Sequence, residues 1–296
     1  MGVHREDSSE TATGEQKRAL ITGAGGLLGR FITSELQTNG FKAVGCSHAE
    51  LDITNQEHVK RSFSTANPEL VINCAATTDV DRCEREPEWA FAVNEAGPRL
   101  LAQCCKEFGA ELVHISTDYV FDGTKQGFYT QEDAPNPLSV YAESKLAGEV
   151  AVRDEISHCN VIRTSWLFGP GGKNFGSRVI ELARSGARLS GVTDQISIPT
   201  YAADLSTRIL EIVRTGSYGL FHATNSGPTT WYEFARLALE LAGLSDVPIR
   251  AVTRADLRQL AKRPHNTALR CLASERLGLA PLRHWRDALE EFIRAK

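Results

Sequence analysis

The chain has 296 residues, of which 42% are hydrophobic, and its formal net charge is −4. This is enough material for one large domain, or two closely joined ones, with a substantial core. Lysine and arginine are scattered along the chain, so the charge pattern gives no sign of a nucleic-acid or membrane partner, and we expect a small-molecule function.

The two features that bear on location are the N-terminus and the cysteines. Residues 1–16 are predicted to form a disordered tail, because charged side chains stand where a signal peptide would become apolar. No later segment is long and apolar enough to span a bilayer. The seven cysteines show no metal-binding spacing, which predicts a cytoplasmic protein with reduced thiols and no metal site. A reactive Cys74 or Cys83 is the alternative to simple packing.

Short apolar runs alternate with segments of helical spacing over the first 170 residues. Strands are predicted at Ala19–Thr22, Lys42–Gly45, Leu70–Cys74, Glu111–Ser116 and Asn160–Thr164. Such alternation builds a parallel sheet covered on both faces. We therefore expect a doubly wound α/β (Rossmann) dinucleotide-binding domain at residues 17–170.

The rhythm changes after the glycine-rich stretch 169–172. Helices are predicted at Trp231–Ala242, with Thr229 and Thr230 as candidate caps, and at His284–Ala295. We expect residues 171–296 to form mainly a smaller substrate-binding domain, partly interleaved with the first.

A glycine motif follows the first predicted strand. Gly23 would make the tight turn, Gly26 would let the backbone approach a pyrophosphate, and Gly29 would let the next helix lie close to the sheet. The helix opens with Leu27, Leu28 and Arg30, and its N-terminus would face the phosphates. The position of the motif after a strand favours nucleotide binding over an ordinary glycine turn.

The second predicted strand bears on the choice of cofactor. It ends Gly45-Cys46-Ser47-His48, without the acid that binds the ribose hydroxyls of NAD, and this favours NADPH. Arg30, Ser47 and His48 are candidates for the extra phosphate, and the alternative is that each is a solvated surface residue. Asp52 is better placed for the adenine edge.

A tyrosine and a lysine four residues apart indicate catalysis. Tyr141 and Lys145 lie on one face of a helix predicted over Val140–Val150. A free phenol has a pKa of about 10, and a neighbouring ammonium should lower it into the range useful for proton transfer. Thr117, at the end of a predicted strand, could donate a hydrogen bond to the same substrate oxygen. The alternative is an accidental surface pair.

At these residues the chain resembles the dTDP-4-dehydrorhamnose reductase family of the extended short-chain dehydrogenase/reductases. The resemblance runs from Ala19 to about Phe292, and the segments that carry it are 112–123, 140–149, 163–169, Asp194-Gln195, Pro199-Thr200, Arg263-Pro264, Asn266 and Leu269. It implies reduction by NADPH, or in some members NADH, of the 4-keto group of a dTDP-linked 6-deoxysugar.

The resemblance also assigns roles to residues. Thr117, Tyr141 and Lys145 fall on the catalytic triad of the family, with Tyr141 and Lys145 also at the cofactor. Asp118, Tyr119 and Trp166 match the substrate site, and core packing is the alternative for the two aromatic residues. Cofactor-lining positions are matched by Asp52, Ile53, Ala75, Ala76 and Thr77.

The chain departs from the family pattern at a few positions. Thr77 stands where an aromatic residue is common, Ala142 and Ser197 where glycine is usual, and Arg270 where an acid is usual. Some members bind magnesium at a dimer contact through C-terminal carboxylates; Glu290 and Glu291 could serve, or could form a solvated helix face. The sequence does not decide whether the protein forms a homodimer.

The sequence also bears on three other functions. A sugar 4,6-dehydratase needs an Asp-Glu pair directly after the threonine, and here Thr117 is followed by Asp118-Tyr119. An epimerase could use the same triad with a retained cofactor. A non-catalytic NADP-binding subunit, similar to the β subunit of methionine adenosyltransferase, could keep the glycine loop, but the intact triad favours an enzyme.

Overall fold

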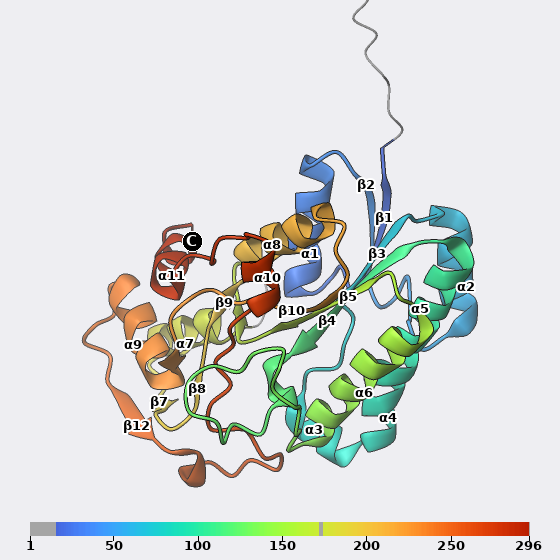
Figure 1. The fold of residues 1–296 in the computed structure, drawn as a ribbon. Helices are drawn as coiled ribbons and strands as arrows, with labels where there is room; N and C mark the ends of the chain where they lie inside the picture. The colour runs from blue at the N-terminus through green and yellow to red at the C-terminus, as the bar shows by residue number, and fades with distance from the viewer. Residues whose placement is uncertain (1–15, 172–173, 296) are drawn as a thin grey trace, which may run out of the picture.

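The computed structural model describes residues 16–171 and 174–295, and almost all of the predicted tail lies outside them. Six strands form a parallel sheet in the order β10-β5-β4-β3-β1-β2 (Figure 1). These strands are β1 (Arg18–Thr22), β2 (Lys42–Cys46), β3 (Leu70–Asn73), β4 (Glu111–Thr117), β5 (Cys159–Thr164) and β10 (Gly219–His222). The predicted α/β fold with a doubly wound parallel sheet is confirmed.

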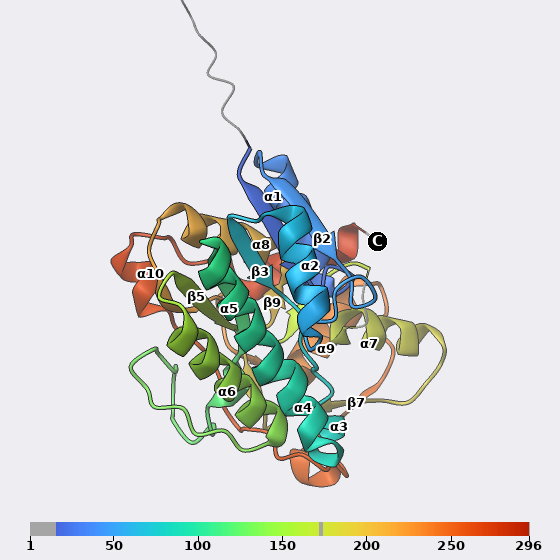
Figure 2. The same ribbon diagram turned by 90° about the vertical axis from the view of Figure 1, so that its right-hand side faces the viewer.

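Helices cover both faces of the sheet, as Figures 1 and 2 show. One face packs against α1 (Leu27–Thr38) and α8 (Ala202–Arg214) in a core that includes Ile21, Ile72, Ile32 and Ile209. The other face packs against α2 (Gln56–Ala66), α5 (Gly97–Phe108) and α6 (Val140–Glu155). Burial on both faces explains the apolar runs Ala19–Ile21 in β1 and Leu70–Ile72 in β3.

Short elements connect these layers. Between β3 and α5 the chain forms α3 (Val80–Arg85), α4 (Pro87–Phe91) and a π-helical turn (Ala92–Ala96), and a 3₁₀ turn (Asp118–Val120) follows β4. Helix α6 begins at the predicted residue, where the Ser139 hydroxyl accepts the N–H of Ala142 at 3.3 Å. It continues five residues beyond the predicted Val150, because its charged last turn hides the apolar spacing.

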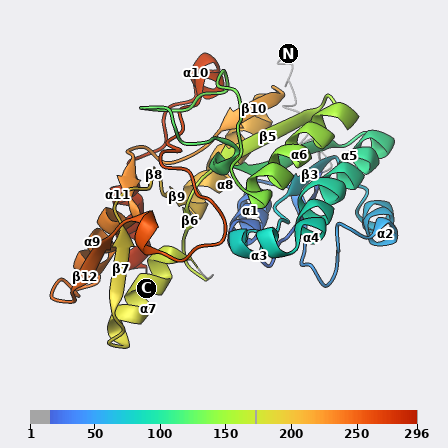
Figure 3. The same cartoon turned by 90° about the horizontal axis from the view of Figure 1, so that it is seen from below.

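The later part of the chain builds a second lobe beside the sheet (Figure 3). Its elements are β6 (Leu167–Phe168), α7 (Phe175–Arg184), β7 (Leu189–Val192), β8 (Ile196–Ser197), β9 (Thr200–Tyr201), β11 (Thr229–Thr230), α9 (Trp231–Leu241), β12 (Ile249–Val252), a 3₁₀ turn (Arg254–Asp256) and α11 (Trp285–Arg294). The short helix α10 (Leu272–Arg276) lies beside β10 of the sheet instead. Helices α9 and α11 agree with the two predicted late helices, and Thr230 caps α9. Phe168, Phe234, Trp285 and Phe292 lie in the core of this lobe.

The two parts interleave, because α8 and β10 come after several second-lobe elements and still belong to the sheet layer. Strand β10 was not predicted: it has four residues and begins at a glycine, too short a run to stand out. No helix in the described part of the chain is both long and apolar enough to cross a membrane.

Candidate active site

The glycine loop has the geometry that a bound pyrophosphate requires. Gly23 has a φ of +65°, and a Cβ there would lie 2.7 Å from the backbone nitrogen of Ala75. A Cβ on Gly29 would lie 2.3 Å from the carbonyl oxygen of Gly23, so α1 can approach the loop only at a glycine. The first turn of α1 has no acidic residue and no side-chain cap, which leaves its N–H groups for an anion. The loop therefore fits a dinucleotide.

The other residues predicted in this loop point in different directions. Leu28 is buried in the core, so only its backbone can face a cofactor, and Leu27 is half-buried. Arg30 is exposed, and its guanidinium lies beside Gly171, where a Cβ would be 3.1 Å from Nη2. Arg30 thus borders the loop that follows β6.

A carboxylate that sequence reasoning missed lies after β2. Glu50 Oε2 accepts hydrogen bonds from both the N–H and the hydroxyl of Ser47, each at 2.7 Å. The strand itself ends without an acid, as expected, but Glu50 folds back onto the residue predicted to bind the extra phosphate. His48 is exposed beside it. Asp52 accepts from the N–H and hydroxyl of Thr54 at 2.9 and 2.8 Å.

The loop after β3 is held by buried amides. Ala75 donates its N–H to Asn73 Oδ1 at 3.1 Å, and Thr77 exchanges two hydrogen bonds with the side chain of Asn94, at 2.9 and 3.1 Å. Ala76, between them, is half-buried. The Ile53 side chain, in contrast, packs against Gly97 in the core, so a cofactor could meet only its backbone.

Thr117 and Tyr141 meet at the carboxyl end of β4. The Thr117 hydroxyl donates to Asp118 Oδ1 at 3.2 Å, and both Thr117 and Tyr141 are buried. Burial raises the pKa of Tyr141 above its usual value, and the nearby Thr117 hydroxyl opposes this rise. The predicted lowering of this pKa by Lys145 is not observed. The prediction omitted the cost of removing a phenolate from water, which is the largest influence on this pKa.

Lys145 is itself deeply buried. Its Nζ donates to the carbonyl oxygen of Ile115 at 2.7 Å. Burial lowers the pKa of Lys145 to about 8, while the Glu149 carboxylate acts in the opposite direction. Glu149, one turn further along α6, is bound by Arg163 and by the Ser116 hydroxyl at 2.5 Å. Sequence reasoning missed both Glu149 and Arg163. For Glu149, the i, i+4 spacing from Lys145 was a usable signal.

Asp118 is almost fully buried behind Thr117. Its carboxylate accepts hydrogen bonds from the hydroxyls of Thr117, Ser197 and Thr267. Burial raises the pKa of Asp118 to about 6. Oδ2 accepts two of these hydrogen bonds and Oδ1 one, so Oδ1 keeps a lone pair for a further donor.

The aromatic residues predicted for the substrate site border this region. Tyr119 accepts a hydrogen bond from Gln195 Nε2 at 2.8 Å, and its ring meets that of Tyr141 edge to face with centroids 6.0 Å apart. Trp166 has a φ of +43°, a strained value for a bulky residue, and its ring stacks on that of Trp231 at 3.7 Å. Its buried indole nitrogen has no hydrogen-bond partner among the described residues. Trp231 was not singled out from the sequence.

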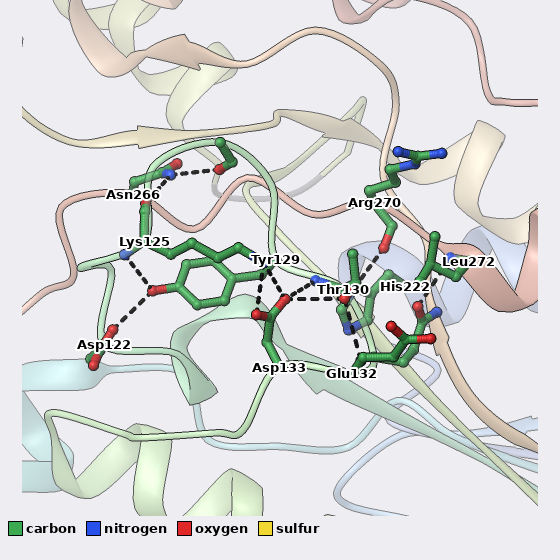
Figure 4. Close-up of polar contacts among 12 residues, drawn as sticks. Asp122, Lys125, Tyr129, Thr130, Glu132, Asp133, His222, Asn266, Arg270 and Leu272 are labelled. Carbon is green, nitrogen blue, oxygen red and sulfur yellow. Dashed lines mark hydrogen bonds and ion pairs between the residues drawn. The ribbon is translucent and has the colours of Figure 1, made fainter.

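Residues 266–270 are hydrogen-bonded to the loop that follows β4 and contains Lys125 and Tyr129 (Figure 4). The Tyr129 phenol donates to Asp122 at 2.8 Å and accepts the N–H of Lys125 at 3.0 Å, and its own N–H donates to the Ala268 carbonyl at 2.8 Å. Asn266 Nδ2 donates to the Lys125 carbonyl at 2.8 Å. The loop and residues 266–270 therefore form one bonded unit next to Asp118.

Neither cysteine considered as a reactive thiol has a lowered pKa. Burial raises the pKa of Cys74 to about 12, and burial also raises that of Cys83. All seven cysteines are free. At neutral pH both thiols stay protonated, as expected of side chains that serve packing.

Comparison with known proteins identifies the family. The family model described as RmlD substrate binding domain matches residues 17–296. A dTDP-4-dehydrorhamnose reductase from Streptomyces griseus is 40% identical over 280 residues, which cover 93% of this chain and 92% of that protein. This chain belongs to the dTDP-4-dehydrorhamnose reductase family.

Two further family relatives bear on cofactor and substrate. The crystal structure of the reductase from Bacillus anthracis in complex with NADP has a TM-score of 0.92 and 34% identity, covering 95% of this chain and all of that one (100%). A dTDP-4-keto-6-deoxy-D-glucose reductase from Streptomyces niveus is 36% identical, covering 93% of this chain and 96% of that protein.

The residues that depart from the family pattern differ in their surroundings. Thr77 is buried and bonded to the Asn94 side chain through its backbone, and Ala142 is buried on α6. Ser197 contributes a hydroxyl to Asp118. Arg270 pairs with Glu275 at 2.7 Å, so its charge is directed at α10.

The C-terminal carboxylates of this family member are engaged in ion pairs. Glu290 pairs with Arg294 and Glu291 with Arg283, each at 2.5 Å. Within residues 16–171 and 174–295, no cluster of three or more His, Cys, Asp or Glu side chains could hold a metal ion.

Proposed function

We propose that this protein uses NADPH to reduce the 4-keto group of dTDP-4-dehydro-L-rhamnose, forming dTDP-L-rhamnose. The proposal is supported by the names of its family relatives and by the NADP in the Bacillus anthracis structure. The observation that carries it is the placement of three buried residues: Tyr141 and Lys145 one turn apart on α6, and Thr117 at the carboxyl end of β4. This is the edge of the parallel sheet at which the glycine loop follows β1.

The chemistry divides between cofactor and protein. NADPH supplies the hydride for the carbonyl carbon. Tyr141 donates its phenolic proton to the carbonyl oxygen, and its raised pKa ensures that the proton is present at neutral pH. Loss of that proton leaves a phenolate. The single hydrogen of the Thr117 hydroxyl is donated to Asp118 Oδ1, so Thr117 stabilises the phenolate only after turning that hydrogen towards it.

Lys145 supports the same step from one helical turn away. An ammonium carries three hydrogens, so it can bind ribose hydroxyls while it keeps its bond to the Ile115 carbonyl. Its positive charge also favours the phenolate that proton transfer leaves on Tyr141. Glu149 helps Lys145 to stay charged, because its carboxylate raises the pKa of the lysine.

We place the substrate-binding site between the second lobe and the carboxyl ends of β4 and β5. We propose that Tyr119 and Trp166 contact the sugar. The Tyr119 ring meets that of Tyr141, and Trp166 follows β5, the strand paired with the Thr117 strand, in a strained backbone conformation. The domain division at residue 170 is part of this proposal: residues 171–296 would supply most of the substrate site. A cytoplasmic location is supported by seven free cysteines.

The test is consumption of NADPH by the purified full chain with four classes of sugar. These are dTDP-4-dehydro-L-rhamnose, dTDP-4-keto-6-deoxy-D-glucose, and UDP- and GDP-linked 4-ketosugars. We expect stoichiometric NADPH loss with the first. Faster turnover with the second would move the assignment to the activity named for the Streptomyces niveus relative.

The other functions have distinct outcomes in the same assay. An epimerase would convert sugar without net NADPH loss. Tight NADPH binding with no turnover of any sugar would favour the non-catalytic subunit. Sedimentation of the same sample measures whether the protein is a homodimer.

A further inference from the structure

The Asp118 carboxylate joins the catalytic strand to the second lobe. Oδ1 accepts the Thr117 hydroxyl at 3.2 Å, and Oδ2 accepts the Ser197 hydroxyl at 2.9 Å and the Thr267 hydroxyl in a short contact. Asp118 is 2% exposed, Ser197 0% and Thr267 1%. Side chains from three distant parts of the sequence therefore meet at one buried carboxylate.

The two donors in the second lobe belong to one bonded unit. Ile196 donates its N–H to the His265 carbonyl at 2.7 Å, and Thr267 donates its N–H to the Ile196 carbonyl at 2.9 Å. Ser197 and Thr267 are thus carried on paired backbone segments. A shift of this pair would move both hydroxyls with respect to Asp118.

A buried carboxylate is not needed to make this contact stable. Removing a charge from water is unfavourable, and an apolar residue of similar volume is often as stabilising as a buried charge with its partners. The unfavourable burial is visible in the pKa of Asp118, which is raised to about 6 although three hydroxyls oppose the rise. A role in placing the neighbouring catalytic hydroxyl gives this arrangement a physical reason.

We propose that Asp118 is a positioning residue, which fixes the Thr117 hydroxyl beside the Tyr141 phenol and is itself fixed by Ser197 and Thr267. The placement of the second lobe, which carries substrate contacts, is thereby transmitted to the catalytic hydroxyl. This inference rests on the proposed reductase function. The positioning role is compatible with a contact to the sugar, because Oδ1 accepts one hydrogen bond from Thr117 and has a second lone pair.

The test is a double-mutant cycle between Thr267 and Thr117. Thr267→Val removes the hydroxyl and keeps the shape, Thr267→Ser restores the hydroxyl, and Thr117→Val removes the group that Asp118 is proposed to place. Rates are measured with saturating NADPH and dTDP-4-dehydro-L-rhamnose, alongside the NADPH Kd and the Tm of each variant. Thr253→Val is the matched control, because Thr253 also donates its hydroxyl to a carboxylate, that of Asp256 at 2.8 Å, in an exposed turn.

We expect Thr267→Val to lower kcat about tenfold, the loss typical of a removed hydrogen bond to a charged group, with an unchanged NADPH Kd. Thr267→Ser should recover most of the activity, and Thr253→Val should match the wild type. In the Thr117→Val background, Thr267→Val should change kcat less than about twofold, because the group it acts through is gone.

Equal losses in both backgrounds, or no loss in Thr267→Val, would overturn the inference and leave the reductase function standing. A wild type that turns over none of the sugars would overturn both. If Thr267→Val does not fold, Ser197→Ala takes its place in the same cycle with the same expected outcomes.

Discussion

Glu149 and Arg163 form a two-point ion pair in the interior of the protein. Nη2 of Arg163 lies 2.7 Å from Oε2 of Glu149 and Nε lies 2.9 Å from Oε1, and both side chains are only 3% exposed. Glu149 lies one helical turn from Lys145. Burial lowers the pKa of Lys145 to about 8, and the Glu149 carboxylate acts in the opposite direction by raising it. The charge on the lysine therefore depends on Glu149.

Glu149→Gln should move the alkaline limb of the kcat/KM profile to lower pH. The substitution removes the carboxylate that raises the Lys145 pKa, so the lysine loses its proton at a lower pH, by about one unit. The measurement is kcat/KM for NADPH across the alkaline range. Glu155→Gln, on the same helix but with a side chain 24% exposed, is the control and should keep the wild-type limb. Identical profiles for both variants would contradict the role of Glu149.

Tyr141→Phe should lower kcat about a hundredfold or more, the usual contribution of a general acid, with little change in NADPH affinity. The phenyl ring keeps the packing and removes only the proton donor. Turnover is compared with NADPH binding measured separately by fluorescence. Tyr218→Phe, at a tyrosine 39% exposed and remote from the triad, should behave as the wild type. Normal turnover in Tyr141→Phe would refute the catalytic assignment.

Gly29→Ala should destabilise the protein by about 1 to 3 kcal/mol and weaken NADPH binding. The new Cβ would lie 2.3 Å from the Gly23 carbonyl oxygen, so the loop or α1 must shift. Gly25→Ala is the control within the same loop, because a Cβ there meets only the Ser47 Cβ at 3.7 Å. Urea unfolding measures the stability of both variants, and NADPH titration measures their Kd. Equal stability and equal Kd in the two variants would mean that the close approach of α1 at Gly29 has no consequence.

Glu50→Gln should raise the ratio of kcat/KM with NADPH to that with NADH, about threefold to tenfold. The carboxylate now takes both donors of Ser47 and would repel a phosphate at that position. Glu57→Gln is the control for a general charge effect, because Glu57 is also an exposed glutamate but lies in the first turn of α2. An unchanged ratio in Glu50→Gln, or an equal rise in both variants, would show that Glu50 does not act on the extra phosphate.

Much of the fold could be predicted because local patterns determine local structure. Strands β1 and β3 contain the apolar runs Ala19–Ile21 and Leu70–Ile72. The predicted limits of β1, β3 and β5 agree with the structure to within about a residue. Strand β10 was missed because four residues after a glycine carry little pattern. Only the finished sheet, with β5 exposing an edge to pair, makes a strand of that segment.

The candidate site was predictable only in part. Thr117 follows a strand and Tyr141 and Lys145 share a helix face, so residue type and spacing were enough to propose them together. The Tyr141 pKa was predicted in the wrong direction, because spacing contains no information on burial. Trp231 was missed for a similar reason, since only the fold stacks it on Trp166.

The sequence by itself determined the alternation of strands and helices, the glycine turn and the pairing of tyrosine with lysine, because each depends on neighbours within a few residues. Only the tertiary structure decided which groups surround that pair. Asp118 accepts hydrogen bonds from the hydroxyls of Ser197 and Thr267, which lie 79 and 149 positions away in the sequence. Glu149 on α6 pairs with Arg163 on β5. Electrostatic effects depend on distance and on exclusion of water, and both arise only once the chain has folded.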